Sequence, residues 1–167
     1  MRSMLFFIDG GARPNPGRAA YGLVMLDDAT TRVWPPPCWG DVLPGASSSN
    51  NEAEWHGMVH AMETAAVLTA GPVHIVTDSQ LVARQMSGAY AVRMPSLQPL
   101  HARATAARAV ITGQGRTVTI THVPRAQNRL ADALATHAIL AGRRVTWHDL
   151  PEHVVARIKP EALRAPH

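Results

Sequence analysis

Apolar and polar positions along the chain form short apolar runs between longer stretches with helical spacing, a pattern that predicts a mixed α/β domain. Strands are expected at residues 4–8, 20–26, 73–77 and 117–121. A further strand, third in order, is expected at Thr31–Trp34, where the prolines at 35–37 would end it. Helices are expected at about 50–69, 80–86, 96–111 and 128–140, where caps, glycines and prolines mark the ends.

The order of these elements predicts a single domain built on one mixed sheet. Strands one to three follow one another without a helix between them, so they are expected to be antiparallel, whereas strands four and five follow helices and are expected to be parallel. The prediction is therefore a five-stranded sheet flanked by helices, within a domain at residues 1–142. Residues 143–167 are expected to form a C-terminal tail that is partly packed or disordered, with one helical turn at 154–158.

Composition narrows the class of protein. The 167 residues are 46% hydrophobic and 17% charged, a balance typical of a globular domain. The one cysteine excludes an internal disulfide and a zinc site of the cysteine type. No run approaches the ~20 apolar residues of a membrane helix, and the N-terminal apolar run is a strand too short for a signal peptide. We therefore expect a cytoplasmic protein, and the net charge of +4 permits nucleic-acid binding without establishing it.

Two aspartates follow predicted strands directly. Asp9 comes after residues 4–8, and Asp78 comes after residues 73–77. Functional groups of open α/β sheets gather beyond the carboxyl ends of the strands, so the two carboxylates are candidates for one shared site. The alternatives are that Asp9 is a turn residue and that Asp78 is a helix N-cap.

Two further acids lie on apolar faces of predicted helices. Glu54 shares a face with Met58 and Ala61, and a carboxylate there is costly unless it is paired or binds a metal. Asp132 similarly lies on the face that carries Ala135 in the last helix. Glu54 could instead lie in water at the edge of its face, and Asp132 could form a surface ion pair with Arg129.

Together the four acids suggest a metal site. Hard oxygen donors without a cysteine or paired-histidine motif suit Mg²⁺ or Mn²⁺. Two such cations about 4 Å apart activate water and stabilise the leaving oxygen in phosphodiester hydrolysis. The acids therefore favour a metal-dependent nuclease.

Four motifs resemble those of the type 1 ribonuclease H family, over about residues 4–141 and in the same order and spacing. The first is Asp-Gly-Gly-Ala-Arg-Pro-Asn-Pro-Gly at 9–17, followed by Tyr-Gly at 21–22. The second is Ser-Asn-Asn-Glu-Ala-Glu at 49–54, and the third is Thr-Asp-Ser-Gln at 77–80. The last combines Val-Pro-Arg-Ala-Gln-Asn at 123–128 with Ala-Asp-Ala-Leu-Ala at 131–135.

The resemblance implies a ribonuclease H-like fold and an endonuclease that cuts the RNA strand of RNA–DNA hybrids. It implies two Mg²⁺ or Mn²⁺ ions per active site, and products with 5′-phosphate and 3′-hydroxyl ends. The implied catalytic metal ligands are Asp9, Glu54, Asp78 and Asp132. His122 falls where many members carry a histidine thought to move protons or aid product release, although it could also simply point outward from a strand end.

The resemblance also implies how the substrate is bound. Four amide side chains fall where members contact the minor groove of the hybrid, and an amide can recognise a 2′-hydroxyl. These are Asn15, Asn50, Asn51 and Gln80; as alternatives, Asn15 is a turn residue and Asn50 and Asn51 are caps. Residues 90–100 pass straight into one helix without the basic handle of the best-studied members, as in the compact, handle-less branch. The nearest substitutes are Arg84, Arg93, Arg103 and Arg108.

Without the handle we expect a weaker grip on the hybrid and a substrate range that includes double-stranded RNA. The chain is expected to act as a monomer with no membrane partner. The alternatives are a nuclease of the same superfamily with another substrate, a non-catalytic nucleic-acid-binding module of this fold, and an unrelated α/β protein whose acids are caps and turns.

Overall fold

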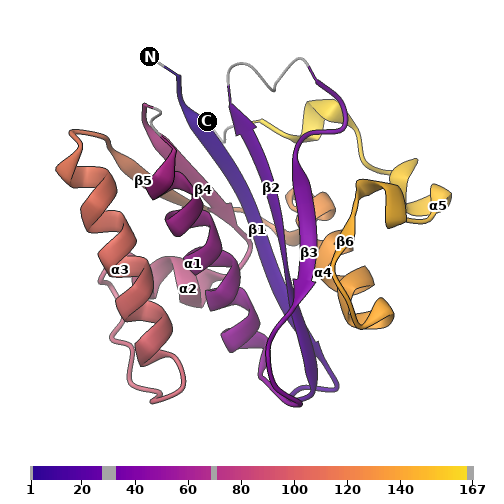
Figure 1. Cartoon of the computed structure of the whole chain (residues 1–167), viewed down its shortest axis with the longest axis horizontal. Coiled ribbons are helices and arrows are strands. Elements are labelled where there is room, and N and C mark those ends of the chain that lie inside the picture. The colour runs from indigo at the N-terminus through magenta and orange to yellow at the C-terminus, as the bar shows by residue number, and fades with distance from the viewer. Residues whose placement is uncertain (1, 28–32, 69–70, 165–167) are drawn as a thin grey trace.

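The computed structural model describes residues 2–27, 33–68 and 71–164, which form one mixed sheet with helices on both faces (Figure 1). The strands within these residues are Met4–Arg13 (β1), Arg18–Asp27 (β2), Cys38–Val42 (β3), Val73–Thr77 (β4), Val118–His122 (β5) and Val145–Thr146 (β6). The α-helices are Asn50–Val67 (α1), Gln80–Met86 (α2), Gln98–Gly113 (α3), Arg129–Ala141 (α4) and Glu152–Val155 (α5). Within the described residues, no helix combines the length and apolar character needed to cross a membrane.

The sheet has the order β5-β4-β1-β2-β3-β6. The pairs β1–β2 and β2–β3 are antiparallel, while β1–β4 and β4–β5 are parallel. The predicted directions are therefore confirmed. The predicted number of strands is one too low, because β6 adds a short antiparallel pair to β3 from the segment expected to be the tail.

The position predicted for the third strand is wrong. Val33 and Trp34 lie in no strand, and residues 31–32 fall outside the described residues. β3 begins at Cys38 instead, directly after the three prolines, where the backbone N–H groups that prolines lack become available for pairing with β2.

Successive residues of β1 point to opposite faces of the sheet and so contribute to two separate cores. Phe6 and Ile8 pack with α1, α2 and α3, whereas Phe7 packs with α4. Figure 1 shows α1 and α3 in front of the sheet and α4 behind it. Each face of the sheet is thus covered, which leaves the ends of the strands as the place where loops and helix ends can gather.

Part of the expected tail packs on the α4 side. Val145, Leu150 and Ile158 are buried in the same core as α4, and α5 supplies the helical turn near the predicted position. Residues 165–167 lie outside the described residues, and the division of the chain into 1–142 and 143–167 stays a prediction.

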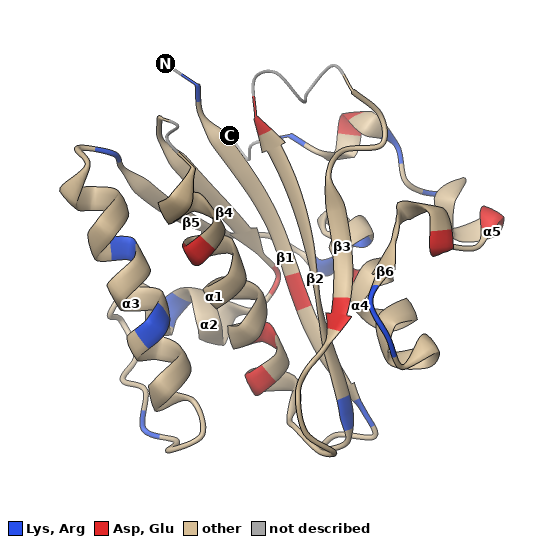
Figure 2. Ribbon diagram, in the orientation of Figure 1, with Lys and Arg blue, Asp and Glu red and all other residues tan. Residues whose placement is uncertain are grey.

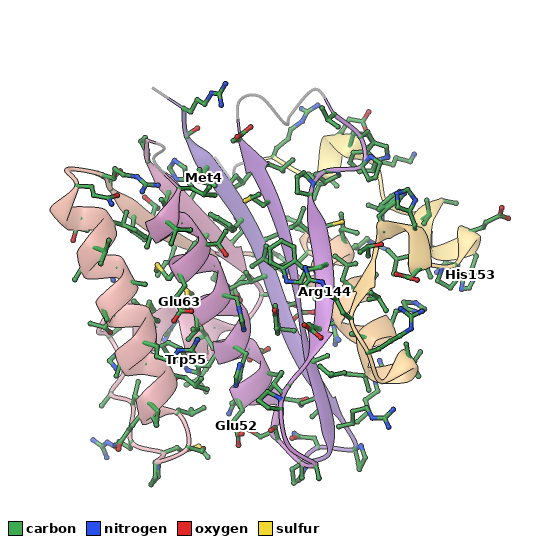
Figure 3. All side chains as sticks on the ribbon, in the orientation of Figure 1. Met4, Glu52, Trp55, Glu63, Arg144 and His153 are labelled. Carbon is green, nitrogen blue, oxygen red and sulfur yellow. The ribbon has the colours of Figure 1, made fainter. Side chains whose placement is uncertain are left out.

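The first helix begins where the sequence predicts it. Ser49 is its N-cap, and the Ser49 side chain accepts a hydrogen bond from the Glu52 N–H at 3.1 Å. Further along α1, the Trp55 indole donates to Gln85 Oε1 of α2 at 2.9 Å (Trp55 is labelled in Figure 3). These contacts fix the start of α1 and its orientation against α2.

Candidate active site

Asp9 and Asp78 lie side by side because of the register between β1 and β4. The last paired residues of these parallel strands are Ile8 and Thr77, and each aspartate comes directly after one of them. β1 continues to Arg13 in its pairing with β2, so Asp9 lies within the strand, opposite Gly22, and not at the strand end as expected. What ends at Ile8 is the pairing with β4.

The helix-cap alternative for Asp78 is wrong. The N-cap of α2 is Ser79, whose hydroxyl accepts a hydrogen bond from the Val82 N–H at 3.2 Å. One carboxylate oxygen of Asp78, Oδ1, is buried and has no hydrogen-bond partner within the described part of the chain. Since a buried charged oxygen without a partner is costly, a cation bound at this carboxylate would offset that cost.

Glu54 reaches the two aspartates because α1 lies directly against β1. A β-carbon at position 10 would overlap the backbone of Ala53 and Glu54, so only Gly10 permits this approach. On the helix, Glu54 shares a face with Met58 and Ala61, which are fully buried. Burial raises the pKa of the Glu54 carboxyl to about 7, against the lowering effect of a hydrogen bond from Ser79.

Asp132 enters from the opposite face of the sheet, in the first turn of α4. The residue before this helix, Asn128, is buried and donates from Nδ2 to the Ile8 carbonyl oxygen at 2.7 Å. This bond fixes the start of α4 next to Asp9. Asp132 pairs with Arg125 (Oδ1 to Nη2, 3.2 Å) and not with Arg129, which donates to the Ala126 carbonyl.

Three of the four acids form a compact group. One oxygen each from Asp9, Glu54 and Asp78 can lie within 4.8 Å of one another. Asp132 lies outside this group but lines the same cavity of about 430 Å³, together with Arg125 and Asn50. Figure 2 shows acidic positions on both α1 and β1, the elements that carry Glu54 and Asp9.

The electrostatics of the group favour a cation. Asp9 is only 6% exposed. Burial, and after it the negative charges of Asp78 and Asp132, raise the pKa of the Asp9 carboxyl to about 10. With its unpartnered Asp78 oxygen, this all-oxygen donor set fits a hard divalent cation such as Mg²⁺ or Mn²⁺.

The amide side chains divide into two groups. Asn15 and Asn50 meet, since the Asn50 N–H donates to Asn15 Oδ1 at 3.1 Å, and Asn50 Oδ1 accepts from the Ala12 N–H at 2.7 Å. Neither Nδ2 group has a partner within the described residues, so both remain able to donate. Asn51 is half-buried in the first turn of α1, and Gln80 is exposed at the first turn of α2.

His122 lies at the edge of the acid group. It is the last residue of β5 and pairs in register with Thr77. Its exposed ring Nε2 lies 3.2 Å from the backbone carbonyl oxygen of Asp78. This places the imidazole beside the backbone of one candidate ligand, outside the three-carboxylate group.

Sequence reasoning missed Arg125 and Ser79 as site residues. Arg125 lies in a 3₁₀ turn, Arg125–Gln127, and pairs with a candidate metal ligand, while Ser79 bonds to Glu54. Their only sequence signal was membership of the quoted motifs. Of the expected handle substitutes, Arg103 forms a bidentate ion pair with Glu63, and Arg108 donates to the Met86 carbonyl.

Comparisons with known proteins agree with this architecture. The model of a family described as "Reverse transcriptase-like" matches residues 7–138. The chain is 38% identical, over 133 residues, to ribonuclease HI of Halobacterium salinarum, covering 80% of this chain and 62% of that protein. The solved RNase H1 from this archaeon superposes with a TM-score of 0.68 at 34% identity, over 83% of this chain and 98% of that chain.

Two other relatives are informative. A bifunctional protein of Mycobacterium tuberculosis is 35% identical over 155 residues, which cover 91% of this chain but 40% of that protein. The chain therefore spans about two fifths of the length of this relative. The compost-derived LC11-RNase H1, solved in complex with an RNA/DNA hybrid, has a TM-score of 0.70 at 28% identity, over 83% of this chain and 98% of that chain.

Proposed function

The chain belongs to the reverse transcriptase-like family and has the ribonuclease H fold. From this premise we propose that it is an endonuclease that hydrolyses the RNA strand of RNA–DNA hybrids. One observation carries the proposal. Three carboxylates, from β1, from α1 and from the turn after β4, converge within 4.8 Å, and one of their oxygens is buried without a partner among the described residues. A non-catalytic binding module would have no need to retain so costly a group of charges.

The proposed cofactors are two Mg²⁺ or Mn²⁺ ions. Asp9, Glu54 and Asp78 would hold the first, and Asp132 would complete the set for the second. When bound, such cations offset the charge of the scissile phosphate and activate the attacking water, which leaves 5′-phosphate and 3′-hydroxyl ends.

The protein's own residues orient the reaction. Gly10 and Asn128 hold α1 and α4 against β1, so that carboxylates from both faces of the sheet meet at one cavity. Arg125 forms an ion pair with Asp132 and so partly offsets its negative charge. His122 is proposed to accept or release a proton at the edge of the site, where its ring is exposed.

Substrate selection is proposed to rest on the amide side chains. The Asn50 N–H donates to Asn15 Oδ1 and the Ala12 N–H donates to Asn50 Oδ1, so within the described residues both Nδ2 groups are left able to donate to a substrate. With Asn51 and Gln80 they would contact 2′-hydroxyl groups in the minor groove. Since double-stranded RNA also carries 2′-hydroxyls, a nuclease that accepts both duplexes is the second candidate. Action as a monomer and a cytoplasmic location stay predictions of the sequence.

A cleavage assay tests the proposal. Labelled RNA–DNA hybrid, double-stranded RNA and double-stranded DNA are incubated with the protein in Mg²⁺, Mn²⁺ or chelator. We expect metal-dependent cutting of the RNA strand of the hybrid, abolished in Asp9→Asn and Asp78→Asn and retained in Asp41→Asn, which changes a surface acid that pairs with Arg144. Binding without metal-dependent cutting by the wild type would favour the non-catalytic module, and equal cutting of duplex RNA would favour the broader nuclease.

A further inference from the structure

A second cavity, of about 290 Å³, adjoins the acid site between α4 and the C-terminal segment around α5. Its lining includes the side chains of Arg13, Arg129, Asp132, His137, His153 and Arg157. Figure 3 labels His153 on α5, at the edge of the molecule. We refer to this cavity as the tail pocket.

The charges of the tail pocket are not balanced within the protein. Arg13, Arg129 and Arg157 form no ion pair within the described part of the chain, and the one acid in the lining, Asp132, pairs with Arg125. The pocket therefore presents a net positive potential to a ligand.

The pKa of His137 is affected by the same positive charges. Burial lowers the pKa of its imidazole, and the positive charges of His153 and Arg13 lower the pKa further. Because a bound anion would offset those charges, the pocket is electrostatically suited to an anionic ligand.

The backbone around the tail pocket is held by packing, while the Arg13, Arg129 and Arg157 side chains are exposed. Ile158 is buried and Val154 packs against the same core as α4, so both sides of the pocket stand on one apolar base. The backbone N–H of Arg157 donates to the Val154 carbonyl oxygen at 3.1 Å and so closes the turn that carries Arg157. On α4, Arg129, Ala133 and His137 recur every four residues and hence share one face.

The tail pocket continues directly into the acid site, because Arg13, Asp132 and Thr136 line both cavities. Arginine recognises phosphate through its planar fork of donors. We propose that the tail pocket binds a backbone phosphate of the nucleic acid, adjacent to the phosphate that is cut at the acids. The inference rests on the proposed function, and it gives the C-terminal segment, which lies beyond the matched residues 7–138, a role in substrate binding.

Binding of hybrid in chelator tests the inference without requiring catalysis. The hybrid carries no terminal phosphates, so that only backbone phosphates can occupy the pocket. Arg157→Gln is compared with Lys159→Gln. Lys159 carries the same charge and lies two residues further along the chain, where it is exposed and outside the pocket. Full-length protein is used throughout, at several salt concentrations.

We expect Arg157→Gln to weaken binding about fivefold at low salt and to reduce the slope of log affinity against log salt by about 0.7–0.9, the value for one lost phosphate contact. Lys159→Gln should leave both quantities close to those of the wild type. In Mg²⁺, Arg157→Gln should raise KM while kcat is unchanged. Equal effects of the two substitutions, or none for Arg157→Gln, would overturn the inference.

This design separates the two proposals. A wild type that binds hybrid through Arg157 but does not cut it would refute the proposed function and support the tail pocket. If the wild type does not bind hybrid at all, the pocket is tested with inorganic phosphate, which should shift the His137 and His153 imidazole NMR signals in Lys159→Gln and much less in Arg157→Gln. The same response in both variants would then reject the pocket.

Discussion

Substituting Asp9 by asparagine should stabilise the metal-free protein. Asp9 is 6% exposed, and its carboxyl pKa is raised from 3.8 to about 10 by burial and by the charges of Asp78 and Asp132. At pH 7 the folded protein therefore keeps a proton that the unfolded chain has released. Asparagine is neutral in both states and avoids this cost.

The sign and size follow from proton linkage. Between pH 3.8 and 10 the folded state binds one more proton at Asp9 than the unfolded state, so the free energy of unfolding falls as the pH rises, by about 1.4 kcal/mol per unit. Up to pH 7 the loss is on the order of 4 kcal/mol. Relaxation and water entry reduce such costs, and we expect a gain of at least about 2 kcal/mol for Asp9→Asn, or roughly 4–8 °C in Tm.

Thermal melts in chelator at pH 5, 6, 7 and 8 measure this effect. The advantage of Asp9→Asn over the wild type should increase at each step, whereas Asp41→Asn should show no such trend, since Asp41 belongs to a surface ion pair with Arg144. With Mg²⁺ the wild type should gain more stability than Asp9→Asn. If Asp9→Asn melts at or below the wild-type temperature at every pH in chelator, the reasoning is refuted.

Three further predictions concern the supports of the site. Asn128→Ala should lower the free energy of unfolding by about 2–3 kcal/mol in urea denaturation, because it leaves the buried Ile8 carbonyl without its donor; no loss would show that water replaces the amide. Gly10→Ala should destabilise by about 3 kcal/mol through overlap with the backbone of α1, while Gly113→Ala, which meets nothing within 4 Å, should be neutral or slightly stabilising; equal Tm values for the two would contradict the close approach. Lowering the pH from 8 to 6 should weaken Mg²⁺ binding in calorimetry by well over tenfold, because the cation must displace a proton from Glu54, with a pKa of about 7, and another from Asp9, with a pKa of about 10; a constant Kd would show that neither is a ligand.

The sequence predicts most elements of this fold because their apolar periodicity is strong, and it fails where tertiary contacts decide. Val33 and Trp34 have strand-forming side chains, yet the third strand is Cys38–Val42, which contains Gly40 and Asp41. A β-carbon at Gly40 would overlap the Leu134 carbonyl of α4, so the glycine is required by packing that no local pattern reveals. β6 has two residues, too few to show any periodicity.

The candidate site shows the same division. Spacing along the chain placed Asp9 and Asp78 directly after two strands and Glu54 on an apolar helix face. The structure pairs those two strands and confirms the face of Glu54, but it has Asp9 within β1. Helical spacing also suggested Arg129 as the partner of Asp132. It failed because Arg129 is the first residue of α4 and turns back to Ala126, while Arg125, in the preceding turn, reaches the carboxylate.

The four acids differ in how firmly the fold holds them, and this difference bears on how the site would work. Asp9 and Asp78 are fixed by the register of adjacent strands, and Glu54 by a helix whose backbone lies against Gly10. Asp132 alone pairs with a cation, and the Arg125 side chain in that pair is 74% exposed, so the ion pair itself holds Asp132 by no more than about 1 kcal/mol. Asp132 is therefore the candidate ligand that can move at least cost. If Asp132 exchanges its contact with Arg125 for one with a metal ion, the fourth carboxylate joins the other three.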